Sequence, residues 1–416
     1  MARDNASASN AYNGLYPLSN DPEFHFELLR VLGLASYGGS DISETLLAAN
    51  EIIPKDFESF SGAFYQLATR VLMAGKVISP IEHAVSFRDT MFRAATYFRA
   101  ADFFLHGNWS DPRINKFWTQ ALTAFDSAVA LIPIPAERVN IKTRDFTIPA
   151  IFYSCGWSGR RPILIIGNGY DGSQEESYHL FVIAALERGF HAITYEGPGQ
   201  PTVRRTQSLG FIPDWEQVVT PVVDFVLTRC EVASDSIGLL GFSFGGYLAP
   251  RAAAFEHRLA AVLAVDGLYD FGKAAHSQFG PLATSIQAGD AQVVNYAIDR
   301  LLANSSTPSA TRWVIQQGMW AFKASTPYQW LVQAPAYSLE GLVGNITAPV
   351  FVGAAESDVF APGQAKQLAD ELGAKATYHL FTDAEGAGTT RPTGLQRLQD
   401  QVVMDWFQDI VGRRRH

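Results

Sequence analysis

A serine between two glycines stands where an apolar run gives way to a helix-like stretch. Gly241 lies two residues before Ser243, and Gly245 lies two residues after it. This spacing is typical of a nucleophile elbow, a tight strand-to-helix turn that presents a serine hydroxyl above a sheet. Glycine is needed at both positions because strand and helix pass too close for a β-carbon. The chemistry that this pattern indicates is attack of Ser243 on a carbonyl carbon.

A serine nucleophile also needs hydrogen-bond donors for the negative oxygen that forms during the attack. The first predicted donor is the amide of Phe244, the residue after the nucleophile. The second should come from the loop after an earlier strand, and the glycine-rich residues 167–172 follow such an apolar run. We expect the amide of Tyr170 to act there, with that of Asp171 as the next candidate. An ordinary strand-to-helix turn is the alternative interpretation of this loop.

The acid of such a site should follow the next-to-last strand of the sheet. Asp358 lies there in chain order, after the apolar run at residues 350–354, and Glu356 is its local competitor. A solvated loop aspartate without a catalytic role is the alternative. We predict that Asp358 is the acid.

The base should be a histidine on the loop after the last strand. That strand is expected to end near Phe381, and residues 382–391 contain no histidine. Beyond Asp358 the chain has only His379, within the predicted strand, and His416, at the terminus. A base could come from elsewhere in the chain, although a lone histidine more often packs or faces solvent. The candidates are His83, His106, His179 and His276.

The elements that must position these residues follow from the hydrophobic periodicity. Residues 21–136 carry apolar side chains at helical spacing and predict a helical N-terminal domain. From residue 137 to 416, apolar runs alternate with helical stretches, which predicts an α/β domain with a mainly parallel sheet between helix layers. Helical segments at 271–345 interrupt this alternation and predict a lid over the carboxyl edge of the sheet, where ligands bind. Residues 1–20, rich in Asn, Ser and Ala, are predicted to form a disordered arm.

Composition narrows the classes of function. The chain has 416 residues, 47% of them hydrophobic and 18% charged, with a net charge of −9. An acidic chain of this kind is not expected to bind nucleic acid or an anionic membrane. Neither a signal peptide nor an apolar run of membrane-spanning length is visible, so we expect a cytoplasmic protein. The spacing of Cys, His and acidic residues suggests no metal site, and no cofactor is expected.

Three segments together resemble one family: the elbow, the Gly-Tyr-Asp-Gly-Ser stretch at 169–173, and Tyr-Glu-Gly-Pro-Gly-Gln-Pro at 195–201. The chain is similar, from about Phe24 to Val411, to α/β-hydrolases of fungal secondary-metabolite pathways with a helical N-terminal domain. That family includes a pigment-pathway hydrolase that shortens a heptaketide naphthopyrone, and bacterial dihydroxypseudooxynicotine hydrolase is a more distant relative. The resemblance implies the α/β-hydrolase fold, with Ser243 as nucleophile and Asp358 as triad acid.

The chain departs from the family pattern at the base. The last-strand loop of the family commonly reads Gly-Ala-Gly-Glu-His, whereas residues 386–390 read Gly-Ala-Gly-Thr-Thr, so Thr390 stands at the histidine position. Threonine cannot serve as a base near neutral pH. The resemblance implies hydrolysis of a C–C bond (a retro-Claisen cleavage of a β-diketone) or of an ester in a polyketide-like substrate. Because Thr390 replaces the base, the alternative is a cyclase or isomerase that uses the oxyanion hole without hydrolysis (an aldol, Dieckmann or dehydrative ring formation). A catalytically silent binding protein is the third interpretation. The sequence leaves open whether the chain forms a homodimer.

Overall fold

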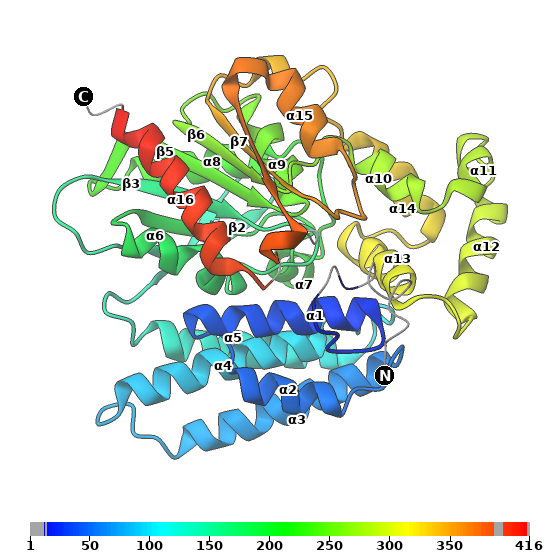
Figure 1. Ribbon diagram of the computed structural model, residues 1–416, viewed down its shortest axis with the longest axis horizontal. Helices are drawn as coiled ribbons and strands as arrows, with labels where there is room; N and C mark the ends of the chain where they lie inside the picture. The colour runs from blue at the N-terminus through cyan, green and yellow to red at the C-terminus, as the bar shows by residue number, and fades with distance from the viewer. Residues whose placement is uncertain (1–11, 13–14, 387–393, 414–416) are drawn as a thin grey trace.

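The computed structural model describes residue 12, residues 15–386 and residues 394–413 (Figure 1). The predicted arm at 1–20 and the predicted histidine position, Thr390, fall largely or wholly outside these ranges. The N-terminal third of the described chain is helical. Its α-helices are α1 (Pro22–Gly33), α2 (Ile42–Asn50), α3 (Phe57–Lys76), α4 (Ala84–Asp102) and α5 (Pro112–Val129).

Aspartates fix where these helices begin. The carboxylates of Asp21, Asp41, Asp56 and Asp111 each accept hydrogen bonds from amides in the first turn of α1, α2, α3 and α5. An N-cap of this type satisfies amides that the helix itself leaves unpaired, and is worth about 1 kcal/mol. The starts of these helices are therefore encoded locally in the sequence.

An eight-stranded sheet forms the centre of the second part of the chain, with strand order β1-β2-β4-β3-β5-β6-β7-β8. The pairs β1/β2 and β2/β4 are antiparallel and the other neighbours are parallel. The predicted mainly parallel α/β sheet is confirmed. The strands are β1 (Glu137–Lys142), β2 (Thr147–Tyr153), β3 (Arg161–Gly167), β4 (His191–Tyr195), β5 (Val232–Phe242), β6 (Ala261–Val265), β7 (Val350–Ala355) and β8 (Ala376–Phe381).

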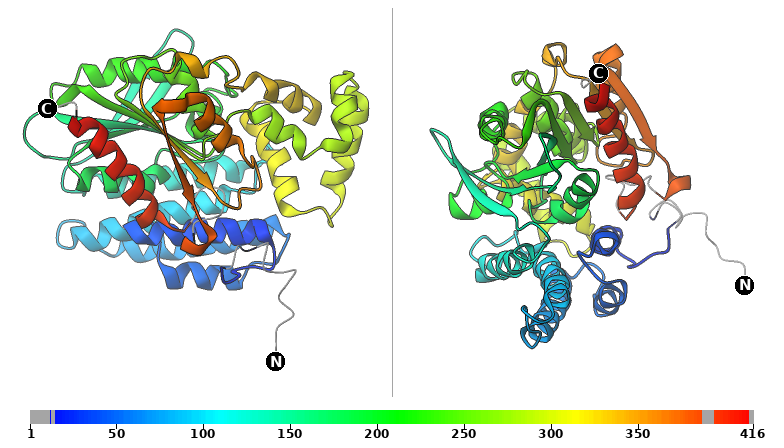
Figure 2. Two further views of the ribbon diagram at one scale, coloured as in Figure 1. Left: turned by 45° about the horizontal axis from the view of Figure 1, so that its top comes forward. Right: turned by 90° about the vertical axis from the view of Figure 1, so that its left-hand side faces the viewer.

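Helices cover both faces of this sheet. One buried cluster joins the sheet to α8 (Glu216–Leu227), α9 (Gly245–Ala253) and α15 (Gln364–Leu372). A second cluster joins the opposite face to α6 (Ile183–Glu187), α16 (Gln396–Arg413) and the helical layer α1–α5. Figure 2 shows the same arrangement from two further sides, with α1–α5 forming a layer of their own beside the sheet. The helical layer thus shares a core with the sheet.

The segment between β6 and β7 forms a group of helices at one end of the sheet (Figure 1). It contacts the helical layer directly, because the Ser309 hydroxyl donates to the Asp21 carboxylate over 2.5 Å and the Trp313 ring stacks on Phe103 with centroids 5.1 Å apart. In the described part of the chain, no helix combines the length and apolar character needed to cross a membrane. The α-helices of this segment are α10 (Phe271–Ser277), α11 (Ala283–Gln287), α12 (Ala291–Ala303), α13 (Ser309–Ala321) and α14 (Pro327–Gln333).

His179 lies in the core between the sheet and the helical layer. Its Nδ1 donates to the Tyr37 carbonyl over 3.0 Å, and its ring packs edge-on against Phe92. Burial lowers the pKa of His179 to about 4. The folded protein therefore prefers the neutral imidazole, and this residue can be protonated only at the expense of stability.

This shift predicts how stability depends on pH. The unfolded chain takes up a proton on His179 near pH 6.5 and the folded chain near pH 4, so stability falls as the pH drops through this window. His179→Asn keeps a donor for Tyr37 but cannot be protonated. From pH 7 to pH 5, we expect the wild type to lose about 2 kcal/mol more unfolding free energy than this variant in urea titrations. The exposed His83→Asn is the matched control, and an equal loss in His179→Asn and the wild type would refute the assignment.

Candidate active site

Ser243 follows β5 in a backbone conformation that side chains rarely adopt, with φ of +58°. Its amide donates to the Val265 carbonyl over 3.0 Å, which ties the turn to the neighbouring strand β6. A β-carbon on Gly241 would lie 2.0 Å from the Gly245 carbonyl oxygen, and one on Gly245 would lie 3.0 Å from the Gly167 oxygen. Glycine two residues before and two residues after Ser243 is therefore a steric requirement of this turn. The turn leaves the Ser243 side chain at a cavity wall.

The loop after β3 passes directly beside this turn. A β-carbon on Gly169 would lie 2.7 Å from the amide nitrogen of Phe244, so glycine is needed for the close approach. The side-chain amide of Gln200 donates to the carbonyls of Asn168 and Gly169 over 2.7 and 3.4 Å. Gln317 donates to the Tyr170 carbonyl over 2.9 Å.

These bonds orient the predicted oxyanion donors. Carbonyl and amide of one trans peptide point in opposite directions. The Tyr170 amide shares its peptide with the Gly169 carbonyl and therefore points away from Gln200. The Asp171 amide shares its peptide with the Tyr170 carbonyl and therefore points away from Gln317. Within the described chain, neither the Tyr170 amide nor the Phe244 amide donates to a backbone carbonyl outside a helix or strand. Among the described residues, these turn and loop contacts of the backbone therefore use neither amide.

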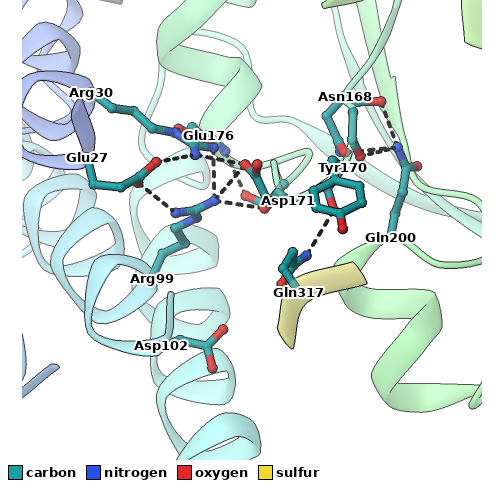
Figure 3. A network of polar contacts seen from close by, with 12 residues as sticks. Glu27, Arg30, Arg99, Asp102, Asn168, Tyr170, Asp171, Glu176, Gln200 and Gln317 are labelled. Atoms are coloured by element: carbon teal, nitrogen blue, oxygen red, sulfur yellow. Dashed lines mark hydrogen bonds and ion pairs between the residues drawn. The ribbon is translucent and has the colours of Figure 1, made fainter. Parts of the chain in front are cut away.

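Asp171, the residue after Tyr170, belongs to a buried cluster of five charged side chains (Figure 3). Arg30 of α1 donates to one Asp171 carboxylate oxygen over 2.8 Å and to both Glu176 oxygens over 2.5 and 2.6 Å. Arg99 of α4 donates to the Asp171 backbone carbonyl over 2.7 Å and lies 3.6 Å from its carboxylate. Glu27 lies 3.3 Å from Arg30 and 3.9 Å from Arg99. Two helices of the helical layer thereby fix a loop that belongs to the sheet.

Mutual attraction keeps this cluster charged. Burial alone would lower the pKa of Arg30, but Glu176, Glu27 and Asp171 raise it well above its ordinary value. Burial would raise the pKa of Glu176, yet Arg30 and Arg99 lower it to about 2. Burial and the neighbouring Arg30 lower the pKa of Arg99. The charged state is therefore maintained by pairing.

A second chain of contacts supports the Tyr170 carbonyl from the other side. His106 lies with its Nδ1 2.6 Å from the Gln317 side-chain oxygen and its Nε2 3.3 Å from Asp102. Arg205 contacts the same Asp102 carboxylate over 2.5 Å and lies 3.1 Å from the His106 Nε2. A donating Nδ1 on His106 leaves the Gln317 nitrogen to face Tyr170. The imidazole of His106 is therefore part of the support behind the loop.

A cavity of about 540 Å³ lies over the turn. The helical layer, the sheet with its loops, and the segment between β6 and β7 all contribute to its wall. Ser243, Tyr170 and Phe244 line it, together with both acid candidates. The Asp358 carboxylate accepts from the amides of Phe360 (2.9 Å) and Ala361 (3.3 and 3.4 Å), and Glu356 accepts from the Asp383 amide (2.8 Å). Aromatic side chains that line the cavity include Tyr12, Phe26, Phe271, Trp313 and Phe360. Within the described residues, no cluster of three or more His, Cys, Asp or Glu side chains could hold a metal ion.

The histidines named in the sequence analysis lie away from this cavity. His83 is exposed, the Nε2 of His276 donates to the Leu331 carbonyl (2.7 Å), and His379 packs between Phe351 and Phe381. His179 and His106 have the structural contacts described above. Thr390 and His416 lie outside the described residues.

Two cavity residues were missed. Asp266 follows β6 directly, with φ of +63°, and lines the cavity. An apolar run followed by Asp-Gly, beside the elbow strand, is a signal that could have indicated it. His25 of α1 is the one histidine of the described chain that lines the cavity. Helical spacing alone gave no sign that it would face the sheet domain.

The support behind Tyr170 yields a prediction. Gln317→Leu removes the donor to the Tyr170 carbonyl, so the loop that carries the Tyr170 amide loses one of its supports. We expect kcat on an aryl ester such as p-nitrophenyl butyrate to fall about tenfold, less than the hundredfold typical for a lost oxyanion donor. The neighbouring Gln316→Leu, which does not contact the loop, should keep its kcat. Equal rates in both variants would show that the Gln317 contact does not position the loop.

Three comparisons relate the chain to known proteins. Over 416 aligned residues it is 32% identical to the hydrolase LUC6 of Fusarium sp, covering 94% of this chain and 97% of that protein. It is 28% identical to the 20-hydroxy-prefusarin hydrolase FUS2 of Gibberella moniliformis, again covering 94% and 97%. The crystal structure of 2,6-dihydroxy-pseudo-oxynicotine hydrolase superposes with a TM-score of 0.66 at 23% identity, covering 91% of this chain and 95% of that one. No family model matches the chain.

Proposed function

This chain belongs to the fungal α/β-hydrolase family of which LUC6 is a member, and we propose that Ser243 is the nucleophile of its hydrolytic reaction. The proposed reaction is hydrolysis of a C–C bond in a β-diketone, or of an ester bond, in a polyketide-like small molecule. One observation carries this proposal: Ser243 stands on a left-handed turn in a cavity wall, beside the Tyr170 and Phe244 amides.

The geometry supports the following sequence for a β-diketone. The Ser243 oxygen attacks one carbonyl carbon, and the amides of Phe244 and Tyr170 bind the oxygen that becomes negative. The C–C bond then breaks, its electron pair leaves as an enolate, and the serine proton is passed to that leaving group. Water next hydrolyses the acyl ester on Ser243, which releases a carboxylic acid and restores the hydroxyl. The net reaction consumes one water and gives one acid and one ketone.

We assign the acid of the site to Asp358, with Glu356 as its competitor. Asp358 is held by two backbone amides at the cavity wall, a geometry that fixes the position of its carboxylate. Asp266 adds a third carboxylate to the same wall.

The substrate class rests on the cavity and on the relatives. A space of about 540 Å³ with aromatic walls fits a substantial, partly apolar molecule. FUS2 is named for hydrolysis of 20-hydroxy-prefusarin, and we extend a secondary-metabolite substrate to this chain. Cyclisation is not favoured, because the similar proteins are named hydrolases. A cytoplasmic location and a homodimer stay predictions.

The proposal predicts the effect of removing one oxygen atom. Ser243→Ala should lower kcat/KM on p-nitrophenyl butyrate and on benzoylacetone, a simple β-diketone, by at least about a thousandfold. A fluorophosphonate should label the wild type at one site per chain and leave this variant unlabelled. Ser127→Ala, on the outer surface of α5, is the control and should retain both properties. Full turnover by Ser243→Ala would show that another group carries out the reaction.

A further inference from the structure

We propose that His25 is a substrate-binding residue whose Nε2–H donates a hydrogen bond to an oxygen atom of the substrate. This inference deepens the proposed function and rests on it. It assigns to the helical layer a direct part in recognition, in addition to its support of the oxyanion loop.

The position of His25 is set by the start of α1. Asp21 caps this helix, and His25 lies one turn further on, with 4% of its surface exposed. The residue lines the cavity that also contains Ser243, at a wall shared with Tyr12, Pro22 and Phe26. The side chain therefore lines the same cavity as the nucleophile, although it comes from the helical layer.

A backbone contact determines which nitrogen of His25 carries the proton. The Leu18 amide donates to Nδ1 over 3.1 Å, so Nδ1 must present its lone pair. The proton of the neutral ring is then on Nε2. Burial lowers the pKa of His25 below its ordinary value, so the ring stays neutral at pH 7. In this state Nε2 can donate but cannot accept, which makes His25 a donor and not the missing base.

Among the described residues, the Nε2 donor of His25 has no partner. Nε2 is buried and hydrogen-bonds to no described residue. Leaving a buried donor unpaired carries a free-energy cost. The ring cannot readily turn to relieve this cost, because Leu18 holds Nδ1 and the Tyr12 ring packs edge-on against it with centroids 5.0 Å apart. An oxygen of a bound substrate would satisfy the group.

The chemistry of the donor defines what it recognises. A neutral N–H in an apolar wall favours a carbonyl, enol or enolate oxygen and gives no advantage to a hydrocarbon of the same shape. The proposed substrate class, a β-diketone or polyketide-like ester, carries several such oxygens. We therefore expect His25 to select oxygenated substrates and to hold them for attack at Ser243.

Binding to a protein that cannot turn over the ligand tests this inference separately from catalysis. In the Ser243→Ala background, the probes are benzoylacetone and butylbenzene, which resembles it in shape but lacks both oxygens. His25→Phe keeps a planar ring without a donor, and His25→Gln keeps an N–H near the position of Nε2. We expect His25→Phe to weaken benzoylacetone binding about tenfold or more, His25→Gln to weaken it less, and neither to change butylbenzene binding.

Several results would overturn the inference. They are an equal loss of affinity for both probes, unchanged benzoylacetone binding in His25→Phe, and absence of benzoylacetone binding in all of these proteins. Fluorophosphonate labelling is measured in parallel with Ser243 intact. Unchanged labelling of His25→Phe is expected for a donor, whereas abolished labelling would identify His25 as the base and contradict the donor role. If the parent protein itself is not labelled, the proposed function fails, and the binding comparison still decides on His25.

Discussion

The loop that carries the proposed oxyanion donor Tyr170 depends on a buried group of opposite charges contributed by two parts of the chain. Arg30 and Arg99 come from the helical layer, and Asp171 and Glu176 follow β3. Such a cluster is costly to dehydrate and is stable only while every charge is paired, and removal of one partner typically costs about 3–5 kcal/mol. Its contribution is therefore best understood as geometric: it allows one arrangement of the helical layer on the sheet and penalises others.

This constraint makes the helical layer part of the active-site scaffold. Arg99 holds the Asp171 carbonyl, while Gln317, from the segment between β6 and β7, holds the Tyr170 carbonyl. Two successive carbonyls are thus fixed from two sides, which orients the Asp171 amide between them, while Gln200 orients the Tyr170 amide through the Gly169 carbonyl. Preorganised donors of this kind stabilise developing charge without rearrangement during the reaction. The helical layer, the sheet with its loops, and the segment between β6 and β7 also all contribute to the cavity wall.

The sequence predicted what depends on local spacing. The glycines around Ser243 and the glycine-rich loop at 167–172 each carry their steric reason within a few residues, and both lie beside the cavity. Contacts between distant segments left no such local signal: Arg30 and Asp171 are 141 residues apart, and nothing in either segment indicates the pair. His25 was missed for the same reason, since helical periodicity tells that a face is buried but not against which element. His106 and His179, considered as bases, are held in supporting contacts that depend equally on the packing of the two parts.

The central claim is that an oxygen on the group attached to Ser243 is bound by the amides of Tyr170 and Phe244. A crystal structure of the protein after reaction with a fluorophosphonate tests it most directly, because the phosphoryl oxygen takes the place of the reaction's negative oxygen. We expect a covalent bond to the Ser243 oxygen, with the phosphoryl oxygen about 2.7–3.1 Å from both amide nitrogens. An unmodified Ser243, or an adduct whose oxygen contacts neither amide, would contradict it.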